Sequence, residues 1–413
     1  MRAEKFFRLG FSTKVSIAGK TGAEFYQEVQ RQAERAKGEK VVFAEGESKF
    51  HCAAVILGAL IAGTPVVPVA EEYGAERIRK IKAVLGKARI PRGVAAILFT
   101  SGTNGEPKGV MLSLHALMRN IRDIRSYMGD VKRRILIFRP LAHSAVFTGE
   151  LLYAIASGWD IEFWNGRFLP AEITTFIKEK EIDLAGMTPS MYKAFLRLRC
   201  KLLVRELILS GECLGKKDAA HFAETANFRI YSVYGLTENA PRVSALLPDE
   251  FRKRAGSVGK PIGSTKCKIV NGELWVKSPS RMMGYLEQKQ ATREKFHFGW
   301  LKTGDIARVD CDGYFYIIGR KDDMIIRGGV NIYPSEIENA FLQLEGVEEC
   351  VAYGTEDERY GQKIIVEYIG TIGEKDMFIR AAKVLPAYLI PSVIRKCDSL
   401  RKTESGKLKR RIR

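Results

Sequence analysis

The stretch Ala96-Ile-Leu-Phe-Thr-Ser-Gly-Thr-Asn-Gly-Glu-Pro-Lys-Gly-Val110 decides the fold of this chain. The apolar run 94–99 predicts a buried strand, and a helical pattern begins near Leu112. Between them, glycines let backbone N–H groups approach an anion, hydroxyls add donors, and a lysine adds positive charge. These residues are Gly102, Gly105, Gly109, Thr100, Ser101, Thr103 and Lys108. The order strand, polar loop, helix therefore predicts a loop that binds a polyphosphate.

This loop does not fit the Walker pattern, in which two glycines five positions apart precede Lys and then Ser or Thr. Here Lys108 follows a proline and precedes Gly109. The segment instead resembles the T-S-G-T-T-G-x-P-K-G phosphate loop of the adenylate-forming superfamily, which includes acyl-CoA synthetases, aryl acid ligases and luciferases. Asn104 stands where that family usually has Thr. A surface turn rich in Gly and Thr is the alternative interpretation.

Length and composition indicate a large globular protein. A chain of 413 residues exceeds the usual size of a single core, so we expect at least two domains. Hydrophobic residues make up 46% and charged residues 28%, as in soluble proteins. The apolar stretch 52–70 is interrupted by Gly63-Thr64-Pro65, which favours a buried helix followed by a strand over a transmembrane segment.

Cysteine usage and charge bear on the compartment and the binding partners of the protein. The seven cysteines are scattered singly, and the amino terminus has no apolar core of signal-peptide length, so we expect a cytoplasmic protein. We also expect a monomer or a homodimer. The net charge of +19 could favour nucleic acid, an anionic membrane, an acidic carrier protein or polyphosphate substrates. No nucleic-acid motif accompanies it, so we expect no specific nucleic-acid partner. A solubilising surface is the plainer interpretation.

The region before the loop predicts an α/β fold. Helical periodicity over 21–37 and a strand at 41–43 precede a buried helix at 50–62 and a strand at 66–69, which together form a βαβ unit. A further helix at 75–85 leads almost directly into the loop. Relatives in the superfamily usually have additional strands and loops at that point, so the resemblance implies a shortened amino-terminal region.

A second motif follows the loop. After a helix at 113–128 and a strand at 135–139, the run Pro140-Leu-Ala-His143 resembles the family's P-L-x-H segment. The resemblance places His143 in the acid pocket near the reacting carboxyl, whereas a lone histidine after a strand is more often structural. Relatives that activate α-amino acids carry an Asp at the position of Ala145, so amino acids are not expected substrates.

Two further segments resemble the nucleotide-binding motifs of the family. Ser210, Gly211 and Glu212 end a predicted strand and match its adenine-facing turn. The run Tyr234-Gly235-Leu-Thr237-Glu238 matches Y-G-x-T-E. The resemblance implies stacking of adenine on Tyr234, a hydroxyl of Thr237 for the α-phosphate, and Glu238 as the carboxylate for Mg²⁺. A strand end followed by a helix cap is the alternative.

The carboxyl-terminal part predicts a small β-subdomain and then a mobile α+β domain. Strands and turns near Gly272 and at 283–285 precede Asp305 and Arg320, which match the family's T-G-D and G-R pair and would bind the ribose. Asp322 matches the hinge, and Lys407, in T-x-S-G-K, matches the lysine that completes adenylation. We therefore predict an AMP-binding domain at 1–320, a hinge at 321–322 and a mobile domain at 323–413.

The resemblance implies an acid–thiol ligase. ATP with Mg²⁺ would convert a carboxylic acid into an acyl- or aryl-adenylate, and rotation about the hinge would then allow coenzyme A to attack it. Two alternatives stay open: a ligase that loads an acidic acyl carrier protein, and a relative that binds nucleotide without catalysis. The identity of the acid is not encoded in these motifs.

Overall fold

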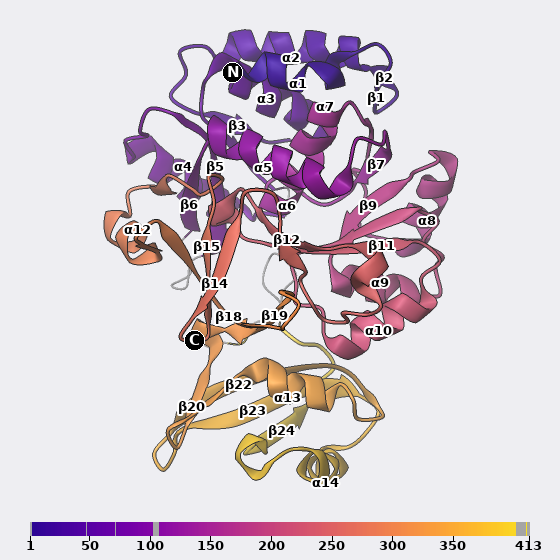
Figure 1. Ribbon diagram of the computed structural model, residues 1–413, viewed down its shortest axis with the longest axis vertical. Helices are drawn as coiled ribbons and strands as arrows, with labels where there is room; N and C mark the ends of the chain where they lie inside the picture. The colour runs from indigo at the N-terminus through magenta and orange to yellow at the C-terminus, as the bar shows by residue number, and fades with distance from the viewer. Residues whose placement is uncertain (1, 47, 71, 102–106, 402–409, 411–413) are drawn as a thin grey trace. The chain divides into compact units, whose positions relative to one another are not determined.

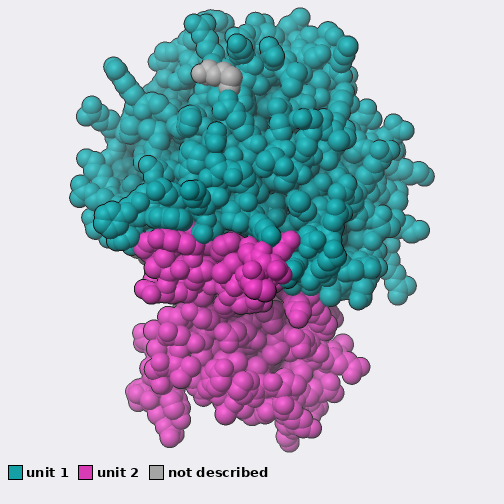
Figure 2. All heavy atoms as spheres, in the orientation of Figure 1, with its two compact units in different colours: residues 1–214, 219–267, 276–302 teal, residues 215–218, 268–275, 303–413 magenta. Residues whose placement is uncertain are grey.

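The computed structural model describes residues 2–46, 48–70, 72–101, 107–401 and 410. The chain divides into two compact units, which Figure 2 shows in different colours. Unit 1 comprises residues 1–214, 219–267 and 276–302, and unit 2 comprises residues 215–218, 268–275 and 303–413. The boundary at 320 and the hinge at 321–322 remain predictions.

Unit 1 contains a nine-stranded sheet with helices packed around it (Figure 1). Its central strands run parallel, and β12, β13 and β2 are the antiparallel additions. In sheet order the strands are β13 (Lys260–Pro261), β12 (Arg242–Leu246), β11 (Arg229–Gly235), β10 (Glu206–Leu209), β9 (Leu184–Met187), β7 (Arg134–Ile137), β8 (Asp160–Phe163), β1 (Ser16–Ile17) and β2 (Lys20–Thr21). This parallel sheet with alternating helices confirms the predicted α/β class.

A second sheet of unit 1 contains the two strands that flank the phosphate loop. Its order is β16 (Gly284–Tyr285), β6 (Pro107–Ser113), β5 (Val94–Ser101), β4 (Val66–Pro68) and β3 (Val42–Ala44). The predicted βαβ unit is confirmed, because β3 and β4 are parallel and α3 (Lys49–Ala62) connects them. Ser48 caps the amino end of α3, and Gly63 ends it in the left-handed conformation.

The predicted order of strand, loop and helix was wrong in one respect. Residues 107–113 form β6, which pairs antiparallel with β5, so the phosphate loop closes a hairpin rather than leading into a helix. The side chains from Val110 to Leu112 are buried, which stabilises an extended conformation despite Pro107 and Gly109. Helix α5 (Leu114–Met128) begins only after β6, with Ser113 as its cap.

Segment 283–285 was also misplaced by the sequence prediction. We expected it in the small β-subdomain, but β16 pairs with β6 in the sheet of the phosphate loop. Backbone hydrogen bonds from Met283 to Met111 and from Leu286 to Gly109, both 2.8 Å, fix this register. The separate β-subdomain sheet contains β14 (Lys266–Val270), β15 (Glu273–Lys277), β17 (Phe296–His297), β18 (Trp300–Val309) and β19 (Phe315–Arg320).

The other helices of the described chain up to residue 302 are mostly amphipathic and cover the sheets. They are α1 (Ala3–Phe7), η1 (Arg8–Phe11), α2 (Gly22–Ala36), α4 (Ala75–Lys87), α6 (Ser144–Val146), the π-helical turn η2 (Phe147–Leu152), α7 (Tyr153–Ser157), α8 (Pro170–Glu179), α9 (Pro189–Arg197), α10 (Lys216–Thr225), η3 (Thr237–Asn239), α11 (Pro248–Phe251) and α12 (Lys289–Lys295). Among the helices of the described ranges, none combines the length and apolar character that crossing a bilayer requires.

The carboxyl-terminal part of unit 2 has an α+β core of its own. Strands β22 and β23 form a long antiparallel pair, and β24, which we did not predict, adds parallel to β23. The elements are η4 (Lys321–Asp323), β20 (Ile325–Arg327), β21 (Val330–Ile332), α13 (Pro334–Phe341), β22 (Val347–Asp357), β23 (Gly361–Gly370), α14 (Glu374–Val384), η5 (Ala387–Leu389) and β24 (Val393–Lys396). Buried side chains from both helices and from the sheet pack together, among them Phe341, Tyr368 and Met377.

Candidate active site

The β5–β6 hairpin carries the described part of the phosphate loop. Thr100 and Lys108 lie opposite each other in the ladder, and Ser101 pairs with Pro107. The predicted loop residues Gly102, Thr103, Asn104 and Gly105 lie outside the described residues. Because ligands of parallel sheets bind at the carboxyl ends of the strands, this end of β5 is suited to hold one.

Tyr285 joins the hairpin to the Y-G-L-T-E motif. The Lys108 ammonium lies 5.6 Å from the centre of the Tyr285 ring, and the Tyr285 hydroxyl donates a hydrogen bond of 2.7 Å to Glu238 Oε1. The backbone carbonyl of Glu238 also accepts a 2.8 Å hydrogen bond from Met282. The structure therefore brings together two predicted residues, Lys108 and Glu238, through a tyrosine that sequence reasoning missed.

The P-L-A-H segment also meets the Y-G-L-T-E motif. His143 is half-buried at the amino end of α6, and the Oγ atom of the next residue, Ser144, lies 3.0 Å from Thr237 Oγ1. Thr237 and Glu238 belong to η3, a single turn after β11. Two motifs about 90 positions apart thus share one edge of the nine-stranded sheet.

Hydrogen bonds from α5 hold that turn in place. The Asn120 side chain donates to the carbonyls of Asn239 and Arg242, at 3.3 and 2.9 Å, and accepts from the Arg242 N–H at 3.1 Å. Burial raises the pKa of the Tyr127 hydroxyl and lowers the pKa of the Arg242 guanidinium. The hydrogen bonds of Asn120 to Asn239 and Arg242 therefore fix the backbone at the end of η3.

The proposed adenine-facing turn follows β10, next to β11. Ser210 is buried, and Gly211 has a positive φ of 92°. The Glu212 carboxylate accepts hydrogen bonds from Ser190, from its N–H at 3.0 Å and from its hydroxyl at 2.7 Å, and so ties the turn to the start of α9. Tyr234 and Gly235 end the adjacent parallel strand β11. Both segments therefore reach the carboxyl edge of the same sheet.

A buried ion pair lies at the same edge. Arg139 follows β7, donates to a carboxylate oxygen of Glu150 and makes two hydrogen bonds of 3.2 Å to Ser210 Oγ. The side chains of Arg139 and Glu150 are only 4% and 0% exposed. A Cβ atom on Gly186 of β9 would lie 2.2 Å from Glu150 Oε1, so any larger residue there would displace the Glu150 carboxylate. This pair joins three neighbouring strand ends and was missed by sequence reasoning.

In unit 2, Asp305 and Arg320 are direct cross-strand partners on β18 and β19. Arg320 Nη1 donates to Asp305 Oδ1 at 2.9 Å, and the Thr303 hydroxyl accepts the Asp305 N–H at 3.0 Å. The predicted ribose-binding pair is therefore brought together, with the guanidinium orienting the carboxylate. Asp322 lies exposed in η4, directly after β19.

Lys407 lies outside the described residues, but Arg410 is described and firmly held. Its guanidinium donates to both oxygens of Glu338 on α13, at 3.0 and 2.7 Å, and lies 3.6 Å from Asp323. The same Glu338 carboxylate accepts the N–H of Ala352 at 3.0 Å. Arg410 is the last residue of the longer form of the terminal pattern, T-x-S-G-K-x-x-R, which spans residues 403–410. The sequence alone does not identify its partner, Glu338.

The donor set suits a magnesium ion bound together with a nucleotide. Within the described residues, no cluster of three His, Cys, Asp or Glu side chains could hold a metal ion. Mg²⁺ is commonly bound by one or two carboxylates together with substrate phosphates. Glu238, beside Lys108 and Tyr285, fits that arrangement.

Comparison with known sequences gives two family matches. The profile described as AMP-binding enzyme matches residues 85–286, and that described as AMP-binding enzyme C-terminal domain matches residues 336–407. The 2-succinylbenzoate–CoA ligase of Bacillus licheniformis is 31% identical over 334 residues, which cover 76% of this chain and 69% of that protein.

A long-chain-fatty-acid–CoA ligase of Escherichia coli O6:H1 is 30% identical over 346 residues. That match covers 78% of this chain but only 61% of the length of the ligase. Among solved structures, the O-succinylbenzoate coenzyme A synthetase of Bacillus subtilis, in complex with ATP and magnesium ion, has the same fold. The TM-score is 0.85 at 23% identity, and the alignment covers 98% of this chain and 97% of that one. The chain belongs to the family of AMP-binding enzymes, the adenylate-forming superfamily.

Proposed function

We propose that the protein activates a carboxylic acid with ATP to form an acyl-adenylate and then transfers the acyl group to coenzyme A. The observation that carries this proposal is the contact of the phosphate hairpin with Glu238 through Tyr285. The names of the two relatives compared above, both CoA ligases, support the same reaction.

The first step is in-line attack of the acid carboxylate on the α-phosphorus of ATP. A bond forms between a carboxylate oxygen and the α-phosphorus, while the bond from that phosphorus to the oxygen of the departing pyrophosphate breaks. The loop residues 100–105 and Lys108 would hold the triphosphate and the departing pyrophosphate. The acid is already ionised at neutral pH, so the step needs no general base.

Other predicted residues would orient the nucleotide and the acid. Tyr234 and the turn at 210–212 would face adenine, Asp305 with Arg320 would bind the ribose, and Thr237 would donate to the α-phosphate. Glu238 would hold Mg²⁺, which when bound neutralises phosphate charge. His143 would line the acid pocket, and Ala145 argues against an α-amino acid substrate because it offers no partner for an ammonium.

The second step needs a thiol to reach the acyl-adenylate. The sulfur attacks the acyl carbon, a thioester forms, and AMP leaves. We propose that Asp322 is the hinge for the movement between the two steps and that Lys407 acts only in the first step. Coenzyme A is the proposed acceptor, and an acidic carrier protein is the alternative that the +19 charge keeps open.

Pyrophosphate exchange over a panel of aryl, short, medium and long acids tests this function. We expect acid-dependent exchange with one class of acid and thioester formation with CoA at a higher rate than with a purified acyl carrier protein. Nucleotide binding without exchange for any acid would exclude the catalytic proposal.

We expect Glu238→Gln to lower kcat/KM for adenylation about 10²–10³-fold, because the anionic ligand for Mg²⁺ is lost.

Tyr285→Phe removes one hydrogen bond to the Glu238 carboxylate and should lower kcat/KM for adenylation about threefold to tenfold. Tyr26→Phe is the matched control, since the Tyr26 hydroxyl also donates to a glutamate, Glu4, but between α2 and α1. A larger loss in Tyr26→Phe than in Tyr285→Phe would contradict the assigned site.

A further inference from the structure

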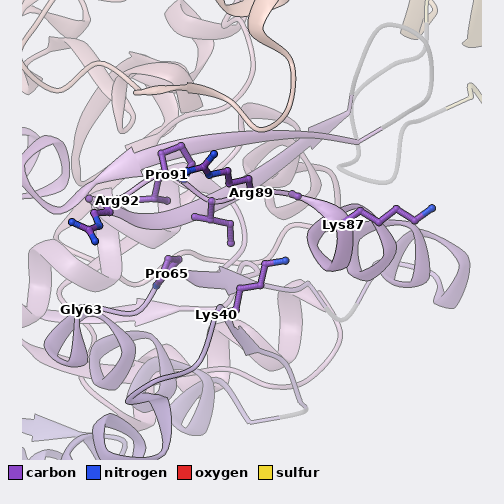
Figure 3. A pocket seen from close by; sticks show the side chains of 11 residues that line it. Lys40, Gly63, Pro65, Lys87, Arg89, Pro91 and Arg92 are labelled. Carbon is purple, nitrogen blue, oxygen red and sulfur yellow. The ribbon is translucent and has the colours of Figure 1, made fainter.

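A pocket of about 640 Å³ lies in unit 1 (Figure 3), and none of the residues assigned to catalysis lines it. Three parts of the chain line it: the run from the end of α4 to the start of β5, the turn between α3 and β4, and Lys40 before β3. The lining residues are Lys40, Gly63, Pro65, Lys87, Ala88, Arg89, Ile90, Pro91, Arg92, Gly93 and Val94.

The pocket lies at the opposite edge of the sheet from the phosphate loop. Strands β3, β4 and β5 are parallel, and the pocket residues precede each of them. The phosphate-loop residues begin at Thr100, near the other end of β5 (Val94–Ser101). At roughly 3.3 Å per residue, the stretch of β5 from Val94 to Thr100 separates the two places by about 20 Å. One small ligand therefore cannot occupy both.

The pocket wall is positively charged. It includes Lys40, Lys87, Arg89 and Arg92 and contains no acidic residue. The segment 77–92 as a whole has seven basic residues and no acidic one, so this charge is locally concentrated rather than a sample of the overall composition. A concave surface of one sign raises the local concentration of oppositely charged ligands.

Two hydrogen-bonded contacts fix the wall. Lys40 Nζ donates to the carbonyls of Leu85 and Gly86 at the end of α4, both at 2.9 Å, which leaves one of its three ammonium protons for a ligand. The Arg89 N–H donates to Glu287 Oε1 at 2.7 Å and so holds the loop backbone from outside the pocket. The arginines thus project from an anchored loop.

Glycines leave the pocket open at the backbone. Gly63 and Gly93 both have positive φ, 78° and 86°, and a Cβ atom at either position would meet no heavy atom within 4 Å. Pro65 and Pro91 restrict the same two turns. A ligand can therefore approach the chain closely at a site whose shape is largely set in advance.

We propose that this pocket is a second anion site, which binds a small ligand carrying two or more phosphate groups independently of the ATP site. Planar guanidinium groups such as those of Arg89 and Arg92 bind phosphate oxygens in pairs, which a point charge does not do. The proposal does not depend on the acid-activating function, since none of its residues belongs to that machinery.

Calorimetric titration with inorganic tripolyphosphate, without divalent cations and with AMP saturating, tests the site in the whole 413-residue chain. AMP carries a single phosphate group, so it fills the nucleotide site without being a ligand of the class proposed for the pocket. We expect one equivalent of tripolyphosphate to bind, and Arg89→Ser/Arg92→Ser to weaken it at least about tenfold while AMP binding stays unchanged. The matched control Arg79→Ser/Lys80→Ser removes the same charge from the exposed face of α4 and should bind as the unsubstituted protein does. No binding under saturating AMP, or equal weakening in both variants, would overturn the proposal.

Citrate and pyrophosphate, which carry nearly the same charge near neutral pH, separate phosphate recognition from attraction between opposite charges alone. We expect citrate to bind at least about tenfold more weakly than pyrophosphate, because its carboxylates cannot reproduce the phosphate geometry. Equal affinity for the two anions would overturn the assignment to phosphates. Circular dichroism of each variant establishes that it is folded before the titration.

Discussion

Replacement of Lys407 by alanine is expected to lower the rate of acyl-adenylate formation about 10²–10³-fold while changing thioester formation from supplied acyl-adenylate by less than about twofold. The reason is that the ammonium would stabilise charge between the acyl and phosphoryl groups only in the first step. Pyrophosphate exchange measures that step, and release of AMP from acyl-adenylate and CoA measures the second.

Lys409→Ala is the control for this experiment, because it removes the same charge two positions further along the chain. It should leave both rates within about threefold of the natural protein. A variant of Lys407 that loses both steps equally would exclude a role confined to adenylation and, with it, the proposed rotation about Asp322.

Glu150→Gln is expected to have the largest effect on stability, a loss of about 3–5 kcal/mol in the free energy of unfolding. The substitution leaves the Arg139 guanidinium buried without its carboxylate, and the buried Arg242 lies close by. Urea denaturation followed by tryptophan fluorescence measures the change, because three of the four tryptophans, Trp159, Trp164 and Trp300, lie in unit 1.

The double variant Arg139→Met/Glu150→Gln should recover at least half of that loss, because one guanidinium leaves together with the carboxylate. Lys82→Met is the control for a surface pair: its partner Glu45 lies 2.9 Å away, and both side chains are more than 40% exposed. It should cost less than about 1 kcal/mol. Additive losses in the double variant would contradict coupling of the buried pair.

Local sequence patterns predicted the fold well where a segment carried one clear periodicity. The predicted helices at 21–37, 50–62 and 75–85 match α2, α3 and α4 within a few residues. Strand β6 escaped prediction because Pro107 and Gly109 argue locally against a strand, whereas pairing with β5 and burial of Val110 favour one. Long-range pairing overrode local preference there.

The residues of the candidate site divide in the same way, into those that a local motif reveals and those that only a contact in the folded chain reveals. Glu238 and Asp305 could be singled out because they lie in motifs that resemble the nucleotide-binding motifs of the superfamily. Tyr285, Arg139 and Glu150 could not, since each is recognised only by a partner distant in the sequence. The pairing of Asp305 with Arg320 lies between these cases: both residues were predicted, but not their direct ion pair.

The close approach of Gly186 to Glu150 links two sequence positions that selection would have to change together. A residue larger than glycine at 186 would displace the Glu150 carboxylate, and a residue at 150 without that carboxylate leaves the Arg139 guanidinium buried without its partner. Replacing Arg139 first would leave the Glu150 carboxylate buried without its partner in the same way, so a single change at any of the three positions is costly. A library that varies position 186 alone should therefore be strongly enriched in glycine.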